Sequence, residues 1–340
     1  MWPFSLIKRE RIKQESKFIR EANKQAKAEE CLLCGRKMTS PCNSHVVPQF
    51  ILRGIAESGK VAYGHALNLF DVGGADRVTG VNNAYTFRLI CNGCDNKYFK
   101  HYENPNNILN YSVLTDAEKK TIMCELAIKA HLSHIQMKFR DLILLNQATQ
   151  GGVAKSIKEH KPNARQLDII EHQTYVKKLK KMMRKDKNPF VVLFDKELDY
   201  QTKLAAQTLI NYNFNLKGER IFDCDLLTSY NKSTYFYLMI LPYKGKTRVM
   251  FYIEASSLVN VHQIVDEFDT LNEEDKLHFL FVSLIIHDQQ FYMTPSFAKQ
   301  IFKKDKKIVK LYTITEMPNE QKRIKDFKKY KNYLTEDYNA

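Results

Sequence analysis

Two pairs of cysteines, each with the spacing C-x-x-C, restrict the fold of this chain more than any other feature. The first pair is Cys31 and Cys34, followed by Gly35, and the second pair is Cys91 and Cys94. Thiolates at this spacing supply two corners of a zinc tetrahedron from one tight turn, and Gly35 permits a left-handed turn. Four thiolates leave no open coordination position, so we expect one structural Zn²⁺ that does no chemistry.

The remaining cysteines do not suggest a disulfide framework. The chain has seven in total, an odd number, and Cys42, Cys124 and Cys224 are scattered. We expect Cys124, in a helical pattern, and Cys224, in a loop, to be small buried or half-exposed residues and not ligands. A thiol–disulfide role for the paired cysteines and a chance occurrence of their spacing are the alternatives to zinc.

The N-terminal stretch argues against a secretory signal, and the length of the apolar runs argues against a membrane-spanning helix. The N-terminal stretch MWPFSLIKRE turns basic too early for a secretory signal. The longest apolar runs, such as the one from Phe279 to Ile286, fall well short of the ~20 residues that span a bilayer. We therefore expect a soluble, cytoplasmic protein without a membrane partner.

Basic residues are in excess and clustered. Lysine and arginine number 53 against 38 acidic residues, a net charge of +15. The excess gathers in 155–187, 299–310 and 322–331, and such blocks attract polyanions. The alternative is an ordinary lysine-rich surface. We expect a nucleic-acid partner, with DNA the first choice, and phosphate contacts from Lys177, Lys178, Lys180, Lys181 and Arg184.

Changes in composition and in the pattern of apolar residues divide the chain into four segments. We expect a basic helix over 1–30, a zinc module over 31–103, a helical segment over 104–187 and an α+β domain over 188–340. The overall class is thus α+β, with a short antiparallel sheet in the last segment. A second copy of the chain or a partner protein would dock on that last domain.

Individual elements follow from local signals. Thr115-Asp-Ala-Glu118 is a capping box that opens a helix reaching Leu145. Lys244-Gly245-Lys246 lies between two apolar runs and predicts a hairpin. Further expected elements are a basic helix over 166–185, a buried strand over 190–194, and helices over 258–271 and 273–286.

Between the two cysteine pairs the order of elements is more specific. His45 begins a short apolar strand that Pro48 ends, and the stretch from Thr86 to Ile90 predicts a second strand. A helix is expected to start after the second pair, at Asp95. The module therefore reads as two strands and a helix joined by zinc.

These residues resemble the HNH endonuclease superfamily (ββα-metal) in its zinc-stabilised treble-clef form. The resemblance is carried by CLLCG, NSHVVPQFILR and FRLICNGCDNKYFKHYE, and covers only 31–103. It implies phosphodiester hydrolysis, with His45 as the general base for water and Asp95, or else Asn96, holding a catalytic Mg²⁺ or Mn²⁺. By analogy, a small protein of this kind resembles restriction or phage-defence nucleases.

One position departs from the family pattern. Many members have Asp or His directly before the base, where this chain has Ser44, a weak cation ligand. The residues nearby in the sequence that are candidates to complete a cation site are His101, Glu103, Asn82 and Asn83. Two alternatives therefore stay open: His45 as a structural histidine with Asp95 as a helix N-cap, and the whole module as a non-catalytic nucleic-acid-binding or protein-interaction domain.

Overall fold

Segments that lie far apart in the sequence come together in two units of the computed structural model. Unit 1 combines Met1–Val46, Thr86–His101 and Thr121–Lys185. Unit 2 combines Val47–Tyr85, Tyr102–Lys120 and Asp186–Ala340. The residues that the structure describes are 17, 21–64, 78–150, 164–221, 233–287, 291–312 and 320–339. The four consecutive segments expected from composition remain a prediction about domain boundaries.

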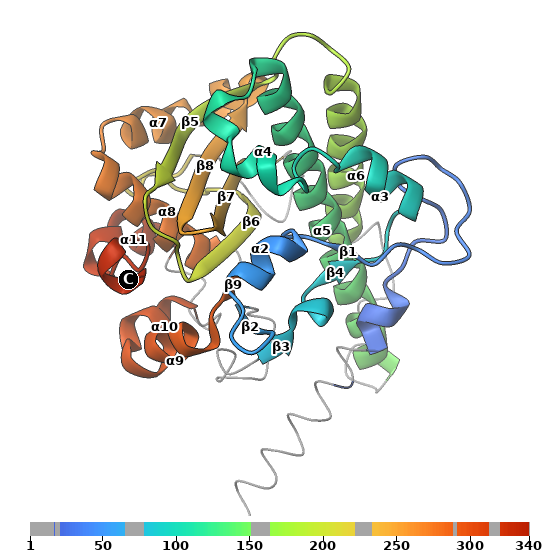
Figure 1. Ribbon diagram of the computed structural model, residues 1–340, viewed down its shortest axis with the longest axis horizontal. Helices are drawn as coiled ribbons and strands as arrows, with labels where there is room; N and C mark the ends of the chain where they lie inside the picture. Colours follow the sequence, from blue (N-terminus) through green and yellow to red (C-terminus); the bar gives the residue numbers. More distant parts are fainter. Residues whose placement is uncertain are drawn as a thin grey trace, which may run out of the picture. The chain divides into compact units, whose positions relative to one another are not determined.

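Unit 1 is built from two long helices and a small strand ribbon that a short helix follows (Figure 1). The long helices lie side by side, since Lys138 of one pairs with Asp168 of the other at 2.8 Å. In the ribbon, Ser44 pairs with Phe87 and His45 with Thr86 in antiparallel register. The elements are β1 (Ser44–His45), β4 (Thr86–Phe87), α3 (Asn92–Tyr98), α5 (Asp116–Gln150) and α6 (Ala164–Met182). The first residues of α5 belong to unit 2.

In the described part of unit 2, an antiparallel sheet of seven strands forms the centre, in the order β3-β2-β9-β6-β7-β8-β5. The strands are β2 (Lys60–Gly64), β3 (Val78–Gly80), β5 (Phe190–Leu198), β6 (Leu204–Ile210), β7 (Phe236–Tyr243), β8 (Lys246–Glu254) and β9 (Phe291–Met293). The combination of helices with antiparallel sheet agrees with the α+β class expected from the sequence. The expected sheet was too small, because it omitted β2 and β3 from between the cysteine pairs and also β6 and β9.

Helices from the C-terminal part of the chain cover one face of this sheet and bury the main hydrophobic core with it (Figure 1). They are α7 (Leu258–Asp269), α8 (Glu273–His287), α9 (Pro295–Lys304), α10 (Lys306–Tyr312), α11 (Glu320–Lys325) and α12 (Glu336–Asn339), with the short turns η5 (Ala255–Ser257) and η7 (Phe327–Lys329). Helix α8 packs against β6 on one side and against α10 and α11 on the other. This explains its continuous buried and mostly apolar run from Phe279 to Ile285, because that part of the helix is enclosed by neighbours, whereas the first turn with Glu273 and Glu274 is exposed.

The other short elements of unit 2 are α2 (Gln49–Gly54), η2 (Val81–Asn83), α4 (Pro105–Leu109) and η3 (Tyr111–Val113). Helix α2 packs on β7, where the ring of Phe50 meets the edge of Tyr243 at a centroid distance of 5.0 Å. Arg248 of β8 lies 4.8 Å from the ring of Tyr111 and pairs with Asp195 at 2.7 Å. Aromatic and charged side chains therefore hold α2 and η3 against the sheet.

Local signals set several boundaries correctly. The hairpin between β7 and β8 turns through Lys244 and Gly245, which both have positive φ, 49° and 81°. A two-residue turn of this kind matches the right-handed twist of the strands. The capping box at the start of α5 is also confirmed: Glu118 N–H donates to Thr115 Oγ1, and Thr115 N–H donates to the Glu118 carboxylate.

Two local expectations were wrong. The strand from Phe190 was expected to be buried, but β5 is an edge strand of the sheet and several of its side chains are half-exposed. The helix after the second cysteine pair starts at Asn92 and not at Asp95, so it includes Cys94. It ends at Tyr98, and His101 and Glu103 therefore lie beyond it.

Some expectations concern residues outside the described ranges. Most of the N-terminal basic helix and Cys224 belong to this group. Among the helices that the structure describes, none has both the length and the apolar character needed to cross a lipid bilayer.

Candidate metal centre and the adjoining polar cluster

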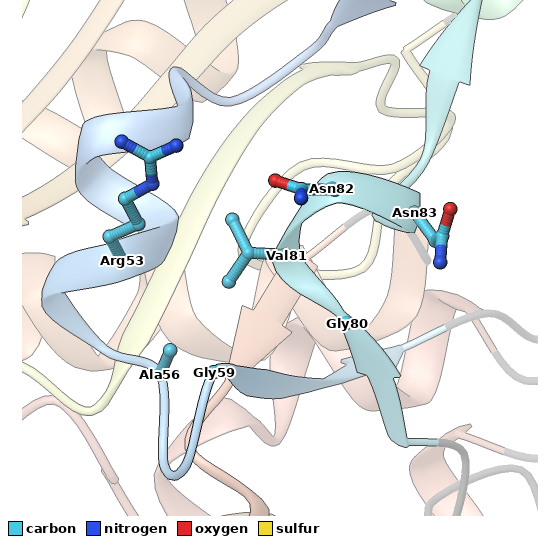
Figure 2. Close-up of a pocket in the computed structure, with 7 residues that line it drawn as sticks. All are labelled: Arg53, Ala56, Gly59, Gly80, Val81, Asn82 and Asn83. Carbon is cyan, nitrogen blue, oxygen red and sulfur yellow. The ribbon is translucent and has the colours of Figure 1, made fainter.

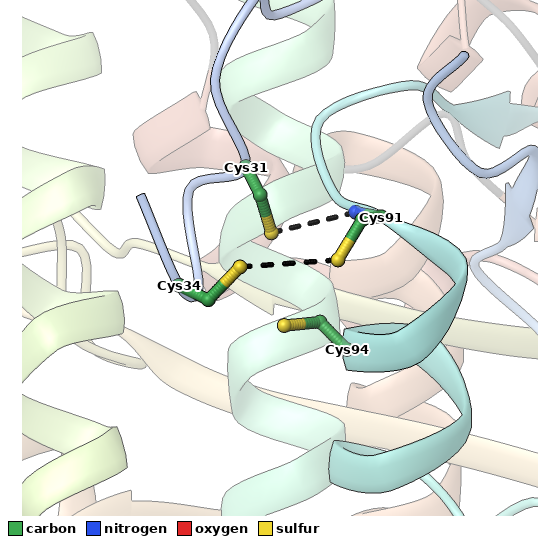
Figure 3. A group of neighbouring side chains, drawn as sticks. All are labelled: Cys31, Cys34, Cys91 and Cys94. Atoms are coloured by element: carbon green, nitrogen blue, oxygen red, sulfur yellow. Dashed lines mark hydrogen bonds between the residues drawn. The ribbon is translucent and has the colours of Figure 1, made fainter. Parts of the chain in front are cut away.

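The four paired cysteines converge in unit 1 (Figure 3). Cys31 and Cys34 come from one loop, and Cys91 and Cys94 from the start of α3. Their four Sγ atoms all lie within 4.8 Å of one another, and Cys34 Sγ and Cys91 Sγ are 3.8 Å apart. A tetrahedral zinc with Zn–S bonds of about 2.3 Å has sulfur atoms about 3.8 Å apart. The cluster therefore has the donor set and the size of a zinc site.

Tight backbone turns present each pair of thiols on one side. In the first pair, Gly35 has φ +74° and its N–H donates to Cys31 O at 2.7 Å. Cys31 N–H in turn donates to Arg36 O at 2.9 Å. The second pair uses the first turn of α3, where Cys94 N–H donates to Cys91 O at 3.0 Å. The left-handed glycine expected in the first turn is confirmed.

Donors close to the sulfur atoms favour the thiolate form at the exposed side of the cluster. Arg36 donates to Cys34 Sγ at 3.4 Å, and this hydrogen bond lowers the pKa of the Cys34 thiol to about 6. Cys91 N–H donates to Cys31 Sγ at 3.4 Å. Burial acts in the opposite direction and raises the pKa of the Cys31 and Cys94 thiols. Metal binding would release the protons of those two thiols, because only thiolates are ligands.

A polar cluster adjoins the metal centre and is centred on Asp95. The Ser44 hydroxyl donates to Asp95 Oδ1 at 2.6 Å, and the Cys42 thiol donates to Oδ2 at 3.3 Å. Asp95 is therefore bound to the segment that leads into β1. The N-cap alternative for Asp95 is wrong, because the cap position of α3 is Cys91.

Lys129 supplies the positive charge in this cluster. Its side chain is fully buried, and its ammonium group lies 3.8 Å from Asp95 Oδ1. It also donates to His45 O at 3.0 Å and lies 4.7 Å from the centre of the Phe99 ring. A buried ammonium is tolerated only when it is paired and hydrogen-bonded, and here it joins α5 to β1 and α3.

The proposed catalytic residues occupy different environments. His45 is half-buried on β1, and Asn96 is exposed on α3. Asp95 is half-buried with the partners described above. The general-base role of His45 and the cation-binding roles of Asp95 and Asn96 stay predictions.

The residues considered for completing a cation site are divided between the two units. His101 is held by the buried Glu125 of α5, which accepts from its Nδ1 at 2.5 Å and from its backbone N–H at 3.1 Å. Glu103, Asn82 and Asn83 belong to unit 2. Their part in a cation site stays a prediction.

Sequence reasoning missed Glu125 and Lys129, although a signal for them was present. The two residues are one helical turn apart, next to Leu126, on the face of α5 that apolar spacing assigns to the core. A charged pair on such a face needs partners from another segment. The sequence does not indicate which segment supplies these partners, because Asp95 and His101 are far from Glu125 and Lys129 along the chain.

The basic residues expected to contact phosphate, four on α6 and Arg184 just beyond its end, differ in exposure. Lys177, Lys181 and Arg184 are exposed, and Lys178 and Lys180 are half-buried. Lys180 donates to Leu33 O in the first cysteine turn and lies 5.4 Å from the centre of the Tyr98 ring. Lys180 thus supports the metal centre, and the three exposed residues are the better candidates for phosphate contacts.

No protein-family model, curated protein or solved structure matches this chain significantly. The fold and the site therefore define only a broad class: an α+β protein with an antiparallel sheet and a cluster of four cysteines suited to a metal ion.

Proposed function

We propose that the chain is an HNH-type endonuclease that cleaves nucleic acid, with DNA the first choice, and that Zn²⁺ at the four cysteines is structural. The observation that carries this proposal is the 2.6 Å hydrogen bond between Ser44 and Asp95. It joins the residue before His45 on β1 to the first turn of α3, directly after the metal ligand Cys94. In unit 1 the first cysteine pair is followed by β1 and β4, and then by α3 with the second cysteine pair, and this order supports a ββα-metal centre of the treble-clef type.

The chemistry assigned to the residues is simple. His45 would accept a proton from the water that attacks the phosphorus atom, since a neutral imidazole is a base near neutral pH. Asp95 would be the anionic ligand for Mg²⁺ or Mn²⁺, and the substrate phosphate would supply further oxygen ligands. When bound, that cation would neutralise the charge that develops on the phosphate oxygens. The exposed basic residues Lys177, Lys181 and Arg184 would bind the phosphate backbone of the nucleic acid.

A second function, a zinc-stabilised nucleic-acid-binding module without catalysis, is favoured by Lys129. Its ammonium already compensates Asp95, and both carboxylate oxygens accept hydrogen bonds. A divalent cation would therefore have to compete with a buried positive charge. Ser44 in place of an acidic or histidine ligand points the same way.

A cleavage assay separates the two functions. Wild-type protein with measured zinc content is incubated with plasmid DNA and with RNA, in Mg²⁺ or Mn²⁺. His45→Ala should lower the cleavage rate by about 10² to 10⁴ while nucleic-acid affinity and zinc content are retained, because only proton transfer is removed. His262→Ala, at an exposed position on α7, is the matched control and should cleave like wild type.

Nucleic-acid binding without cleavage by the wild type, under every metal condition, would support the binding module instead. Cleavage that His45→Ala leaves unchanged would remove His45 from the mechanism.

A further inference from the structure

A surface cavity of about 430 Å³ lies in unit 2, between α2 and η2 (Figure 2). Arg53 and Ala56 line it from the side of α2, Gly59 from the turn before β2, and Val81 and Asn82 from η2. This volume falls within the range of about 300–1,000 Å³ that is usual for small-molecule sites. The roles proposed above for His45 and Asp95 do not use this cavity, although Asn82 and Asn83, which were considered for a cation site, line it.

A chain of hydrogen bonds fixes the polar groups of the cavity. Arg53 Nη2 donates to Gln49 Oε1 at 2.9 Å, and Gln49 Nε2 donates to Asn82 Oδ1 at 2.8 Å. The oxygen of the Asn82 amide is thus already in use, and its NH₂ group is the part left to meet a ligand. Arg53 keeps further N–H donors beyond the one that Gln49 accepts. The cavity therefore offers mainly donors.

Among the described residues, no carboxylate balances the charge of Arg53 at this cavity. Its side chain is exposed, and in the described part of the chain no carboxylate forms an ion pair with it or lines the cavity. Glu57 is close in sequence, but its carboxylate accepts from Ser296 N–H at 2.9 Å and from the Ser296 hydroxyl. The described residues that line the cavity thus carry a net positive charge.

The floor of the cavity combines backbone with small apolar side chains. Gly59 has φ +73°, and a Cβ atom there would meet nothing within 4 Å, so the space beside it is open. Val81 N–H donates to Gly59 O at 3.1 Å and ties η2 to the turn before β2. In Figure 2 the side chains of Ala56 and Val81 point toward this space, while Asn83 turns away from Arg53.

We propose that this cavity binds the phosphate group of a nucleotide, with Arg53 and Asn82 as donors and Val81 and Ala56 in contact with the organic part. A guanidinium beside an amide NH₂ suits an oxyanion with several acceptor oxygens. The volume leaves room for more than the phosphate itself. The nucleotide is either free or part of a nucleic-acid strand. The proposal does not depend on cleavage activity.

Binding to the full-length protein without added divalent cation tests the proposal. The probes are inorganic phosphate and AMP, followed by calorimetry, and fluorescein-labelled eight-nucleotide DNA and RNA strands, followed by anisotropy. Asn82→Asp keeps the acceptor for Gln49 but replaces the donor by a negative oxygen. Arg53→Gln removes the charge. Lys217→Gln is the control, since Lys217 is exposed in the same unit and does not line the cavity.

At least one probe should bind saturably, and both cavity variants should weaken its binding at least tenfold while Lys217→Gln leaves it unchanged. If the cavity variants weaken the binding of phosphate or AMP but not of the oligonucleotides, the ligand is a free nucleotide. If they weaken the binding of the oligonucleotides, the ligand is a nucleic-acid strand. Thermal unfolding of each variant confirms that it is folded. Absence of saturable binding by every probe, or binding that either folded cavity variant leaves unchanged, would overturn the proposal.

Discussion

The Nδ1 atoms of His131 on α5 and His172 on α6 lie 2.9 Å apart in the interior of unit 1. One of them must donate and the other accept, so the pair is stable only while at least one ring is neutral. Burial lowers the pKa of both imidazoles well below the usual 6.5, and it lowers the pKa of the neighbouring His134 to about 3.

This arrangement predicts acid sensitivity. An unfolded chain takes up protons at these histidines below about pH 6.5, whereas the folded chain does not. Their contribution is therefore fully favourable above pH 6.5 and is lost as the pH falls toward the folded pKa values, by up to about 1.4 kcal/mol per pH unit for each ring. Denaturant unfolding between pH 7.5 and 5 measures it. His172→Phe should flatten the slope, whereas the control His262→Asn, at an exposed site, should not. Equal slopes for His172→Phe and wild type would contradict this account.

The thiol cluster predicts metal-dependent folding of unit 1. Protein purified without added metal should contain about one zinc per chain, measured by elemental analysis. Cys34→Ser and Cys94→Ser should each lose the metal and part of the cooperative unfolding transition, because metal binding at such a site is folding free energy. Cys124→Ala is the control: Cys124 is buried on α5 outside the cluster, and this variant should keep its zinc. Wild-type protein that is metal-free and fully folded would refute the structural role.

Ser44→Asp tests whether a divalent cation can bind beside Asp95. Two carboxylates would then face one ammonium, Lys129, so the variant should be less stable than wild type without divalent cations. If a cation site forms, Mg²⁺ or Mn²⁺ should raise its melting temperature more than that of wild type, since binding to the folded state stabilises it. The control is Ser44→Asn, because asparagine has the shape of aspartate without its charge. The same metal response in both variants would argue against a cation there.

The basic face of α6 predicts salt-dependent binding. Lys177 and Lys181 are exposed, so each Lys→Gln change there should reduce the slope of log affinity against log salt by about 0.9 on duplex DNA. Lys180→Gln should act differently and lower the melting temperature, because Lys180 bonds to Leu33 O. Lys217→Gln again serves as the control. Slopes unchanged by the Lys177 and Lys181 variants would assign these residues to an ordinary solvated surface.

The capping box at the start of α5 predicts a small, defined effect on stability. Thr115→Ala removes the oxygen that accepts from Glu118 N–H and should cost about 1 kcal/mol in the free energy of unfolding. Thr174→Ala is the matched control, since Thr174 lies within α6 and its hydroxyl bonds to Ile170 O one turn earlier. Its effect should be close to zero. A similar loss in both variants would show that capping is not the cause.

The sequence predicted those features whose cause is local. The cysteine turns, the Lys244–Gly245 hairpin and the Thr115 capping box all depend on residues within four positions of each other. Pairings between distant segments were not predictable in the same way. Nothing near Lys129 in the chain indicates that it will meet Asp95, and nothing near β2 indicates that its partner is β9. A single sequence indicates the propensity of each segment to form a helix or a strand, but tertiary packing determines which segments pair.

The position of β9 between β2 and β6 has a consequence for biosynthesis. Lys60–Gly64 leaves the ribosome long before Phe291–Met293 is made, so β2 and β3 must wait for nearly the whole chain before they can join the sheet. Pairings over such distances along the chain slow folding. During translation this hairpin has an unpaired edge, which is the kind of surface that chaperones shield and that other chains can pair with.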